Sequence, residues 1–159
     1  SDPKMIQPFY QTVFDAIDEL SDSAKNLMEK AIIAKQNAYA PYSKFKVGAA
    51  LLLEDGTIVT GNNQENAAYP SGMCAERVAI WKASSDFPNL KILKLAISAS
   101  SSSQILKEPV APCGGCRQVM LETELRQKSD FKVVLVSQNN KTMVFSAAKD
   151  LLPMAFGSK

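Results

Sequence analysis

Apolar residues recur every three or four positions in several stretches of the chain, a spacing typical of helices with one buried face. The first stretch covers residues 6–20, and the second covers residues 24–38. The Ser21-Asp22-Ser23 segment offers side chains that can cap the start of the second helix, and Pro41 marks its end. Two N-terminal helices are therefore predicted.

Short apolar runs bounded by turn residues predict strands after these helices. Residues 47–53 form one such run, Asp55 and Gly56 give a hairpin turn signal, and residues 58–62 return as the partner strand. The rest of the pattern predicts strands over 92–98, 131–137 and 142–146, helices over 74–86 and 114–126, and a short helix over 147–152.

Helices and strands that alternate in this way indicate an α/β fold built on a layered sheet. The five predicted strands make a mixed sheet, in which the hairpin is antiparallel and the later strands are expected to be parallel. The chain of 159 residues is predicted to form one main domain over residues 23–159, preceded by a helical extension over residues 1–22.

The charge balance does not favour a nucleic acid as the main partner. The net charge is only +2, and no run of five basic residues occurs. No apolar run approaches the roughly 18 residues that a membrane span needs. The start of the chain lacks the pattern of a signal peptide, and Met5 is an even candidate for the natural start.

Three cysteines in a chain without an export signal point to a reducing compartment, and a cytoplasmic protein is expected. The chain has no histidine, so a soft metal would have only Cys74, Cys113 and Cys116 to bind it. Three protein ligands with an open fourth position are typical of catalytic zinc. All three cysteines lie at predicted helix starts, where the helix dipole favours thiolates. The pattern therefore predicts a zinc ion.

Charged residues beside the cysteines indicate how such a site would work. Glu76 stands two residues after Cys74, where it can act as an acid or base beside a water activated at the metal. A structural ion pair is the alternative role. Two of the chain's three arginines, Arg77 and Arg117, lie within three residues of a cysteine. One or both are expected to donate to the thiolates, and the alternative is a surface arginine near a helix start.

A polar segment follows the predicted 58–62 strand. In an extended chain Asn63 and Glu65 point to the same side, where an amide and a carboxylate can bind adjacent hydroxyls. Composition alone favours the plainer interpretation, a polar loop.

The sequence contains Cys74-Ala75-Glu76 followed by Pro112-Cys113-Gly114-Gly115-Cys116, which matches the signature of zinc deaminases. Beyond this motif, the chain resembles the small, homotetrameric cytidine deaminases. The resemblance covers residues 23–157, and it implies a three-layer α-β-α sandwich around a mixed five-stranded sheet. Its further segments are Pro41-Tyr42-Ser43-Lys44-Phe45, Val47-Gly48-Ala49-Ala50, Gly61 to Pro70, Arg117-Gln118-Val119, Leu151-Leu152-Pro153 and Phe156-Gly157.

The resemblance also implies an activity: zinc-dependent hydrolytic deamination of cytidine and deoxycytidine to uridine and deoxyuridine, with release of ammonia, in pyrimidine salvage. Glu76 would take a proton from water, protonate N3 of the base and help ammonia leave. One zinc per subunit would be bound by Cys74, Cys113 and Cys116. The other implied roles are stacking on the pyrimidine by Phe45, a main-chain contact to the base from Ala75, ribose binding by Asn63 and Glu65, charge neutralisation by Arg77, and completion of a neighbouring subunit's site by Tyr69 and Phe156.

Three other functions stay open from the residues alone. A deaminase of nucleic acid generally uses histidine as its first ligand and needs a basic groove, and Cys74 and the weak charge argue against it. A thiol redox protein built on Cys113 and Cys116 is disfavoured by the third cysteine beside a glutamate. A zinc-stabilised module without activity would need a fourth ligand from solvent or from another subunit.

Overall fold

One mixed sheet lies at the centre of the computed structural model, which describes residues 11–14 and 17–157. The strand order is β1-β6-β5-β4-β2-β3, with β4 and β5 parallel and the other pairs antiparallel. The strands are β1 (Gln11–Phe14), β2 (Phe45–Leu53), β3 (Ile58–Asn62), β4 (Ile92–Ser101), β5 (Lys132–Val136) and β6 (Thr142–Phe145).

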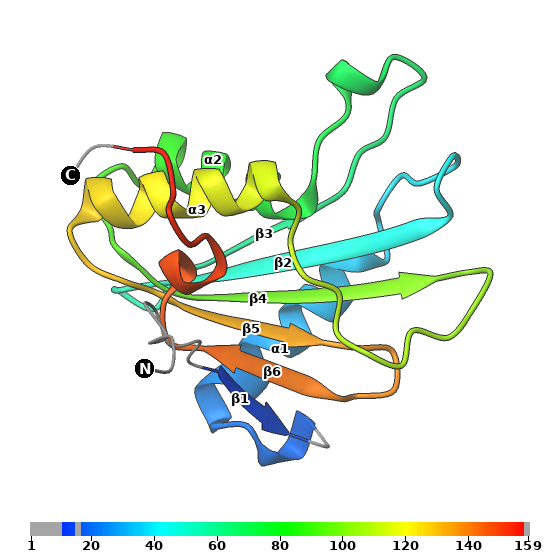
Figure 1. Cartoon of the computed structure of the whole chain (residues 1–159), viewed down its shortest axis with the longest axis horizontal. Coiled ribbons are helices and arrows are strands. Elements are labelled where there is room, and N and C mark those ends of the chain that lie inside the picture. The colour runs from blue at the N-terminus through cyan, green and yellow to red at the C-terminus, as the bar shows by residue number, and fades with distance from the viewer. Residues whose placement is uncertain (1–10, 15–16, 158–159) are drawn as a thin grey trace, which may run out of the picture.

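Helices cover both faces of this sheet (Figure 1). The helix α1 (Asp22–Lys35) packs on one face, while α2 (Ala75–Asp86) and α3 (Gly114–Gln127) pack on the other. The alternation of strand side chains divides the core into these two layers. In β2, for example, Ala50 packs toward α1, whereas Ala49 and Leu51 belong to the cluster under α2 and α3. The expected three-layer α-β-α sandwich is confirmed.

The N-terminal prediction is wrong where the structure tests it. A helix was expected over residues 6–20, but residues 11–14 form β1, which pairs with β6 as a sixth strand, and Ile17–Glu19 form a 3-10 turn, η1. Residues 1–10 and 15–16 lie outside the described part. The free main-chain groups along the edge of β6 pair with this segment. Such pairing depends on a distant part of the chain, so the local periodicity of residues 6–20 cannot predict it. The division of the chain at residue 22 stays a prediction.

The later elements agree with the sequence pattern in kind, with some differences in direction. The hairpin over Asp55 and Gly56 is confirmed, and Gly56 has the positive φ of 91° that such a turn needs. The strands β4 and β5 are parallel as expected, but β5 and β6 are antiparallel, because the short turn between them allows only a hairpin. The short helix predicted over 147–152 is a 3-10 turn, η3 (Ala148–Leu151), and a further 3-10 turn, η2 (Tyr69–Ser71), follows Ala68.

Two glycines allow helices to lie directly on the sheet. A Cβ on Gly48 would fall 2.0 Å from the main-chain oxygen of Ala31 in α1. A Cβ on Gly61, at the end of β3, would fall 2.7 Å from both the oxygen of Ala75 and the nitrogen of Ala79 in α2. The first turn of α2 is therefore fixed against the sheet by main-chain contact.

A buried carboxylate joins α3 to the end of the chain. Glu124 is 4% exposed and accepts hydrogen bonds from the main-chain nitrogens of Phe131, Ala148 and Lys149, at 2.9, 3.0 and 2.7 Å. It thus connects α3 to the approach to β5 and to η3. Across residues 11–14 and 17–157, no helix has the length and apolar character to cross a membrane.

Candidate active site

The three cysteines come together where α2 and α3 begin. Cys74 is the N-cap residue of α2, Cys113 is the N-cap residue of α3, and Cys116 lies in the first turn of α3. Their sulfur atoms all lie within 4.8 Å of one another, and the Sγ atoms of Cys74 and Cys113 are 3.9 Å apart. The predicted cysteine cluster is therefore confirmed, with both helix N-termini directed at it.

The spacing of the sulfurs suits a metal ion. Zinc–sulfur bonds of about 2.3 Å in tetrahedral geometry place two sulfurs about 3.8 Å apart, close to the distance between Cys74 and Cys113. All three cysteines are free of disulfides. Cys116 is buried, Cys74 is half-buried and Cys113 is exposed, so the cluster can be reached from one side. The donor set fits the three-ligand zinc site that the sequence predicts, with the fourth position left to solvent or substrate.

Arg77 supplies positive charge to this cluster. Its Nη2 atom donates to Cys74 Sγ at 3.3 Å, as predicted for one of the two arginines. Hydrogen bonds from the Cys116 thiol and from Arg77 lower the pKa of Cys74 to about 5, although burial opposes this shift. The same hydrogen bond to Cys74, together with burial, raises the pKa of Cys116. Cys74 is therefore the first thiolate of the cluster.

Glu76 lies beside the sulfurs and is almost completely enclosed. Its side chain is 5% exposed, and it stands in the first turn of α2, two residues after Cys74. Burial raises the pKa of Glu76, the Cys74 thiolate raises it further, and a hydrogen bond from Cys116 acts in the opposite direction. A carboxyl group whose pKa is raised by burial is suited to take up a proton and pass it on as a general acid or base.

A cavity of about 350 Å³ opens next to the cluster. Its walls come from the start of β2, the segment after β3, the N-terminus of α2, the end of β4 and the segment before α3. Among the residues predicted from sequence, it is lined by Phe45, Asn63, Glu65, Cys74, Ala75, Glu76 and Cys113. The structure thus brings the predicted base, ribose and metal contacts to one cavity.

The two polar residues after β3 are held by the main chain around them. The side-chain amide of Asn63 accepts from the nitrogen of Val47 at 2.9 Å and donates to the oxygen of Phe45 at 2.8 Å. Glu65 accepts from the main-chain nitrogens of Tyr42 and Ser43 at 3.0 and 3.1 Å, and from the Ser43 hydroxyl. Burial alone would raise the pKa of Glu65, but these hydrogen bonds outweigh it and the pKa lies below its ordinary value.

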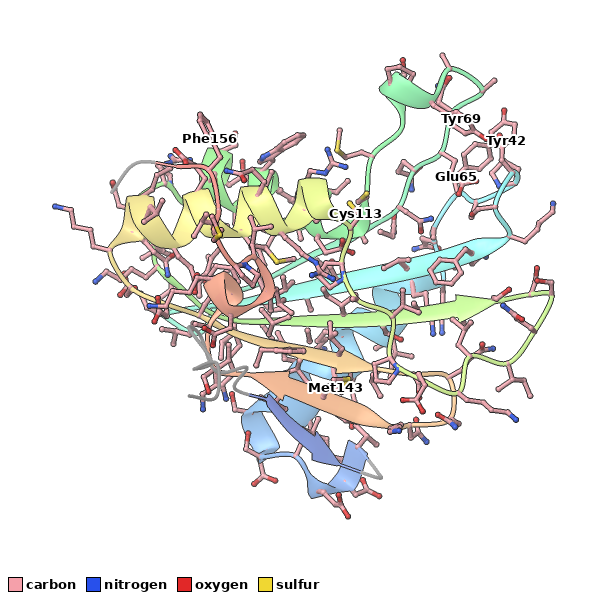
Figure 2. All side chains as sticks on the ribbon, viewed as in Figure 1. Tyr42, Glu65, Tyr69, Cys113, Met143 and Phe156 are labelled. Atoms are coloured by element: carbon pink, nitrogen blue, oxygen red, sulfur yellow. The ribbon has the colours of Figure 1, made fainter. Side chains whose placement is uncertain are left out.

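Three predicted site residues neither line this cavity nor contact the sulfur cluster. Arg117 donates to the main-chain oxygens of Pro112 and Leu151, both at 2.8 Å, and so braces the segment before Cys113 instead of approaching a sulfur. Tyr69 is 81% exposed in the segment that projects from the sheet, near Tyr42 and Glu65 (Figure 2). Phe156 is 88% exposed, and Figure 2 places it over α3, well away from Tyr69.

Sequence reasoning did not name as site residues seven of the residues that line the cavity. Three of them, residues 110–112, directly precede Cys113, and the other four come from β2, β4 and the turn before β2. Val47 and Ala99 are opposite each other in the β2–β4 pair, and Ile97 lies two residues before Ala99 on the same face. Their alternation along each strand is visible in the sequence, but the register between β2 and β4 is not. Ser43 is the fourth, and its contact to Glu65 spans 22 positions of the chain.

Comparisons with known proteins agree with this geometry. Residues 21–135 match the family model described as the cytidine and deoxycytidylate deaminase zinc-binding region. A cytidine deaminase of Halalkalibacterium halodurans is 42% identical over 130 residues, covering 82% of this chain and 91% of that protein. A cytidine deaminase of Sporosarcina psychrophila is 50% identical over 99 residues, covering 62% and 68%.

A solved structure supports the same relationship at the level of the fold. The cytidine deaminase of Burkholderia pseudomallei superposes with a TM-score of 0.71 and 40% sequence identity, over 86% of this chain and all of that one. The matched family region contains Cys74, Glu76, Cys113 and Cys116. The chain belongs to the cytidine and deoxycytidylate deaminase family and carries that family's zinc-binding region.

Proposed function

We propose that this protein is a zinc-dependent enzyme that hydrolyses cytidine and 2′-deoxycytidine to uridine and 2′-deoxyuridine, releasing ammonia, in pyrimidine salvage. One observation carries the proposal: a buried carboxylate, Glu76, lines a cavity of about 350 Å³ together with Cys74 and Cys113, and the buried Cys116 completes their sulfur cluster. A pocket of this volume lies at the small end of the range for small-molecule sites. Relatives of 42% and 50% identity are named cytidine deaminase.

Cys74, Cys113 and Cys116 would hold the zinc, and Arg77 would offset the negative charge that three thiolates bring. The bound ion supplies Lewis-acid activation of a water at neutral pH. Glu76 then acts as the proton carrier: it takes a proton from water, delivers it to N3 of the base, and later assists the departure of ammonia. Enclosure of its carboxyl group keeps bulk water from competing for this proton.

The rest of the cavity is proposed to hold the nucleoside. Phe45 would stack on the pyrimidine, and the main chain of Ala75 would contact the base edge at the start of α2. Asn63 and Glu65 would bind the ribose hydroxyls. Each keeps free hydrogen-bonding capacity for this, since the Asn63 amide has one N–H and one lone pair beyond its two main-chain bonds.

Tyr69 and Phe156 are proposed to complete the site of a neighbouring subunit in a homotetramer. Both are large aromatic side chains with more than four-fifths of their surface exposed in one chain. Aromatic anchors of this kind are enriched at protein interfaces. A reducing compartment such as the cytoplasm is proposed, because the zinc site needs three reduced thiols.

The test is ammonia release by the purified protein from cytidine, deoxycytidine, free cytosine and single-stranded DNA, before and after removal of zinc. The matched variants are Glu76→Gln and Glu122→Gln, the second of which changes an exposed carboxylate on α3. We expect zinc-dependent release from the two nucleosides. Glu76→Gln is expected to lower turnover by at least about 100-fold with zinc still bound, whereas Glu122→Gln is expected to behave as the unmodified protein.

Other outcomes point elsewhere. Release from DNA alone would make the protein a nucleic-acid deaminase. A Glu76→Gln variant that binds zinc and turns over cytidine at a near-normal rate would remove Glu76 from the mechanism. Stoichiometric zinc with no release from any of the four compounds would contradict the proposed reaction.

A further inference from the structure

Ser43 lies between Phe45 and Glu65, two residues that are proposed to contact the substrate. It lies in the turn that leads into β2, and it lines the cavity together with Phe45 and Glu65. Lys44, the next residue, has a positive φ of 59°, and its nitrogen bonds to the oxygen of Ala40. The turn therefore has a fixed shape that presents the main-chain nitrogens of Tyr42 and Ser43 to the neighbouring segment.

These donors grip the carboxylate of Glu65. Oε1 of Glu65 accepts from the nitrogens of Tyr42 and Ser43, at 3.0 and 3.1 Å, while Oε2 accepts from the Ser43 hydroxyl. Figure 2 shows Glu65 beside Tyr42 at this end of the molecule. The main chain fixes one oxygen of the carboxylate, and the orientation of the other depends on a single side chain.

An ionised carboxylate offers about four lone-pair sites. Two on Oε1 are taken by main-chain donors and one on Oε2 by Ser43, so the remaining site is on Oε2. A ribose hydroxyl that donates to Glu65 would use this site. The Ser43 hydroxyl thus decides the direction in which the free lone pair of Glu65 points.

The same hydroxyl is tied to the base side of the cavity. Ser43 Oγ accepts from the main-chain nitrogen of Phe45 at 3.0 Å. Its one proton goes to the charged Glu65 carboxylate, a stronger acceptor than the Phe45 carbonyl oxygen 3.5 Å away. The carbonyl of Phe45 is meanwhile held by the Asn63 amide at 2.8 Å. Ser43 therefore connects Glu65 to Phe45 through one oxygen atom.

We propose that Ser43 is a positioning residue for sugar recognition, which aims Glu65 Oε2 at the ribose hydroxyl and keeps it in register with Phe45. The inference rests on the proposed function, in which Glu65 binds ribose. Ser43 itself need not touch the substrate. Its removal should therefore weaken the recognition of a nucleoside that has ribose hydroxyls. A nucleoside that lacks them should be little affected, because the Asn63 amide still holds the carbonyl of Phe45.

The experiment compares kcat/KM for cytidine and for 2′,3′-dideoxycytidine in the zinc-loaded protein and in Ser43→Ala, Ser43→Thr and Ser102→Ala. Ser43→Ala removes a hydrogen bond to a charged carboxylate, so it should lower kcat/KM for cytidine by roughly 10-fold or more, mainly through KM. Activity on dideoxycytidine should stay within about 2-fold of the unmodified protein. Ser43→Thr keeps the hydroxyl and should keep kcat/KM for cytidine near that of the unmodified protein.

Ser102→Ala is the matched control. Ser102 is an exposed serine whose nitrogen bonds to the oxygen of Lys44 at 3.1 Å, so it supports the same turn without contacting Glu65. Replacing its hydroxyl should change kcat/KM for neither substrate. An equal fall in kcat/KM for both substrates in Ser43→Ala would show a merely structural role and overturn the inference. Unchanged kcat/KM for cytidine in Ser43→Ala would also overturn it.

A fourth variant, Glu65→Gln, tests the inference separately from the proposed function on which it rests. Suppose that Glu65→Gln lowers kcat/KM for cytidine but not for dideoxycytidine, while Ser43→Ala lowers neither selectively. That result would support ribose binding by Glu65 and contradict the role of Ser43. If Glu65→Gln lowers kcat/KM equally for both substrates, the ribose contact of the proposed function is itself wrong. A double variant, Ser43→Ala with Glu65→Gln, should lose little more cytidine activity than Glu65→Gln alone, because both changes act on the same ribose contact.

Discussion

Replacing Gly61 by alanine should disturb the zinc site from beneath, because the atoms nearest the added methyl group belong to the main chain of α2. The added Cβ would lie 2.7 Å from the oxygen of Ala75 and from the nitrogen of Ala79, where ordinary contacts begin at 3.4 Å. The neighbours are main-chain atoms of α2, so a side-chain rotation cannot relieve the contact. The helix must move away from the sheet by roughly 0.7 Å, at the turn that carries Cys74 and Glu76.

Two separate effects are expected from this shift. Overpacking in a well-filled core costs about 1–3 kcal/mol of unfolding free energy. A misplacement approaching 1 Å near a reacting centre can lower the rate by about 100-fold, so kcat/KM for cytidine should fall by roughly 10- to 100-fold. Chemical denaturation measures the first effect, and ammonia release well below the unfolding temperature, at saturating zinc, measures the second.

Gly114→Ala is the control for this prediction. Gly114 follows Cys113 directly and so is closer to the sulfurs in sequence, yet a Cβ there would meet nothing within 4 Å in the described structure. It should leave both stability and kcat/KM near those of the unmodified protein. The reasoning would be refuted by a Gly61→Ala variant that loses stability but retains full kcat/KM, because the close approach to the sheet would then not position the site.

Three further outcomes follow from contacts described above. Glu124→Ala leaves two buried main-chain donors and one part-buried donor without their acceptor, and it should cost about 3 kcal/mol or more of unfolding free energy. Glu122→Ala, exposed on the same helix, should cost little, and equal losses in denaturant titrations would contradict this. Arg77→Gln should weaken zinc binding by about 10- to 100-fold in a chelator competition, with the exposed Arg126→Gln unchanged; identical affinities would show that the guanidinium is not needed. The pKa of Glu65 is lower in the folded protein than its ordinary value of 4.5, so Glu65 contributes stability that is present above that value and lost as the pH falls through the folded pKa. The Tm advantage of the unmodified protein over Glu65→Gln should therefore shrink on acidification, and an advantage that grows would refute the sign.

The cysteine cluster was predictable because few arrangements were available. The chain offers only three soft ligands, and all of them stand at predicted helix starts, where a shared location is easy to infer. The direction of the neighbouring arginines was not predictable in the same way. Arg77 lies three residues after Cys74 and Arg117 lies directly after Cys116. Only Arg77 donates to a sulfur, whereas Arg117 donates to two carbonyls, because their partners come from different parts of the fold.

The errors share a physical origin in contacts between distant segments. The periodicity of residues 6–20 suits a helix, but residues 11–14 pair with β6, which lies about 130 positions later. Ser43 lacks a local signal for the same reason, since its partner Glu65 reaches it only after the β2–β3 hairpin has formed. Local patterns give the type of most elements, whereas the edges of the sheet and the walls of the cavity depend on strand register.

The cysteines that form the cluster belong to two helices, and Cys74 and Cys113 are 39 positions apart. In the unfolded chain a zinc ion could find at most the neighbouring pair Cys113 and Cys116 within a few residues. Folding and metal binding are therefore thermodynamically linked, because the complete ligand set exists only in the native state. Each tenfold rise in free zinc above the dissociation constant adds about 1.4 kcal/mol to the stability of the fold. The ion would thus act as a reversible cross-link between α2 and α3, and zinc supply would regulate how long the protein persists as well as how fast it works.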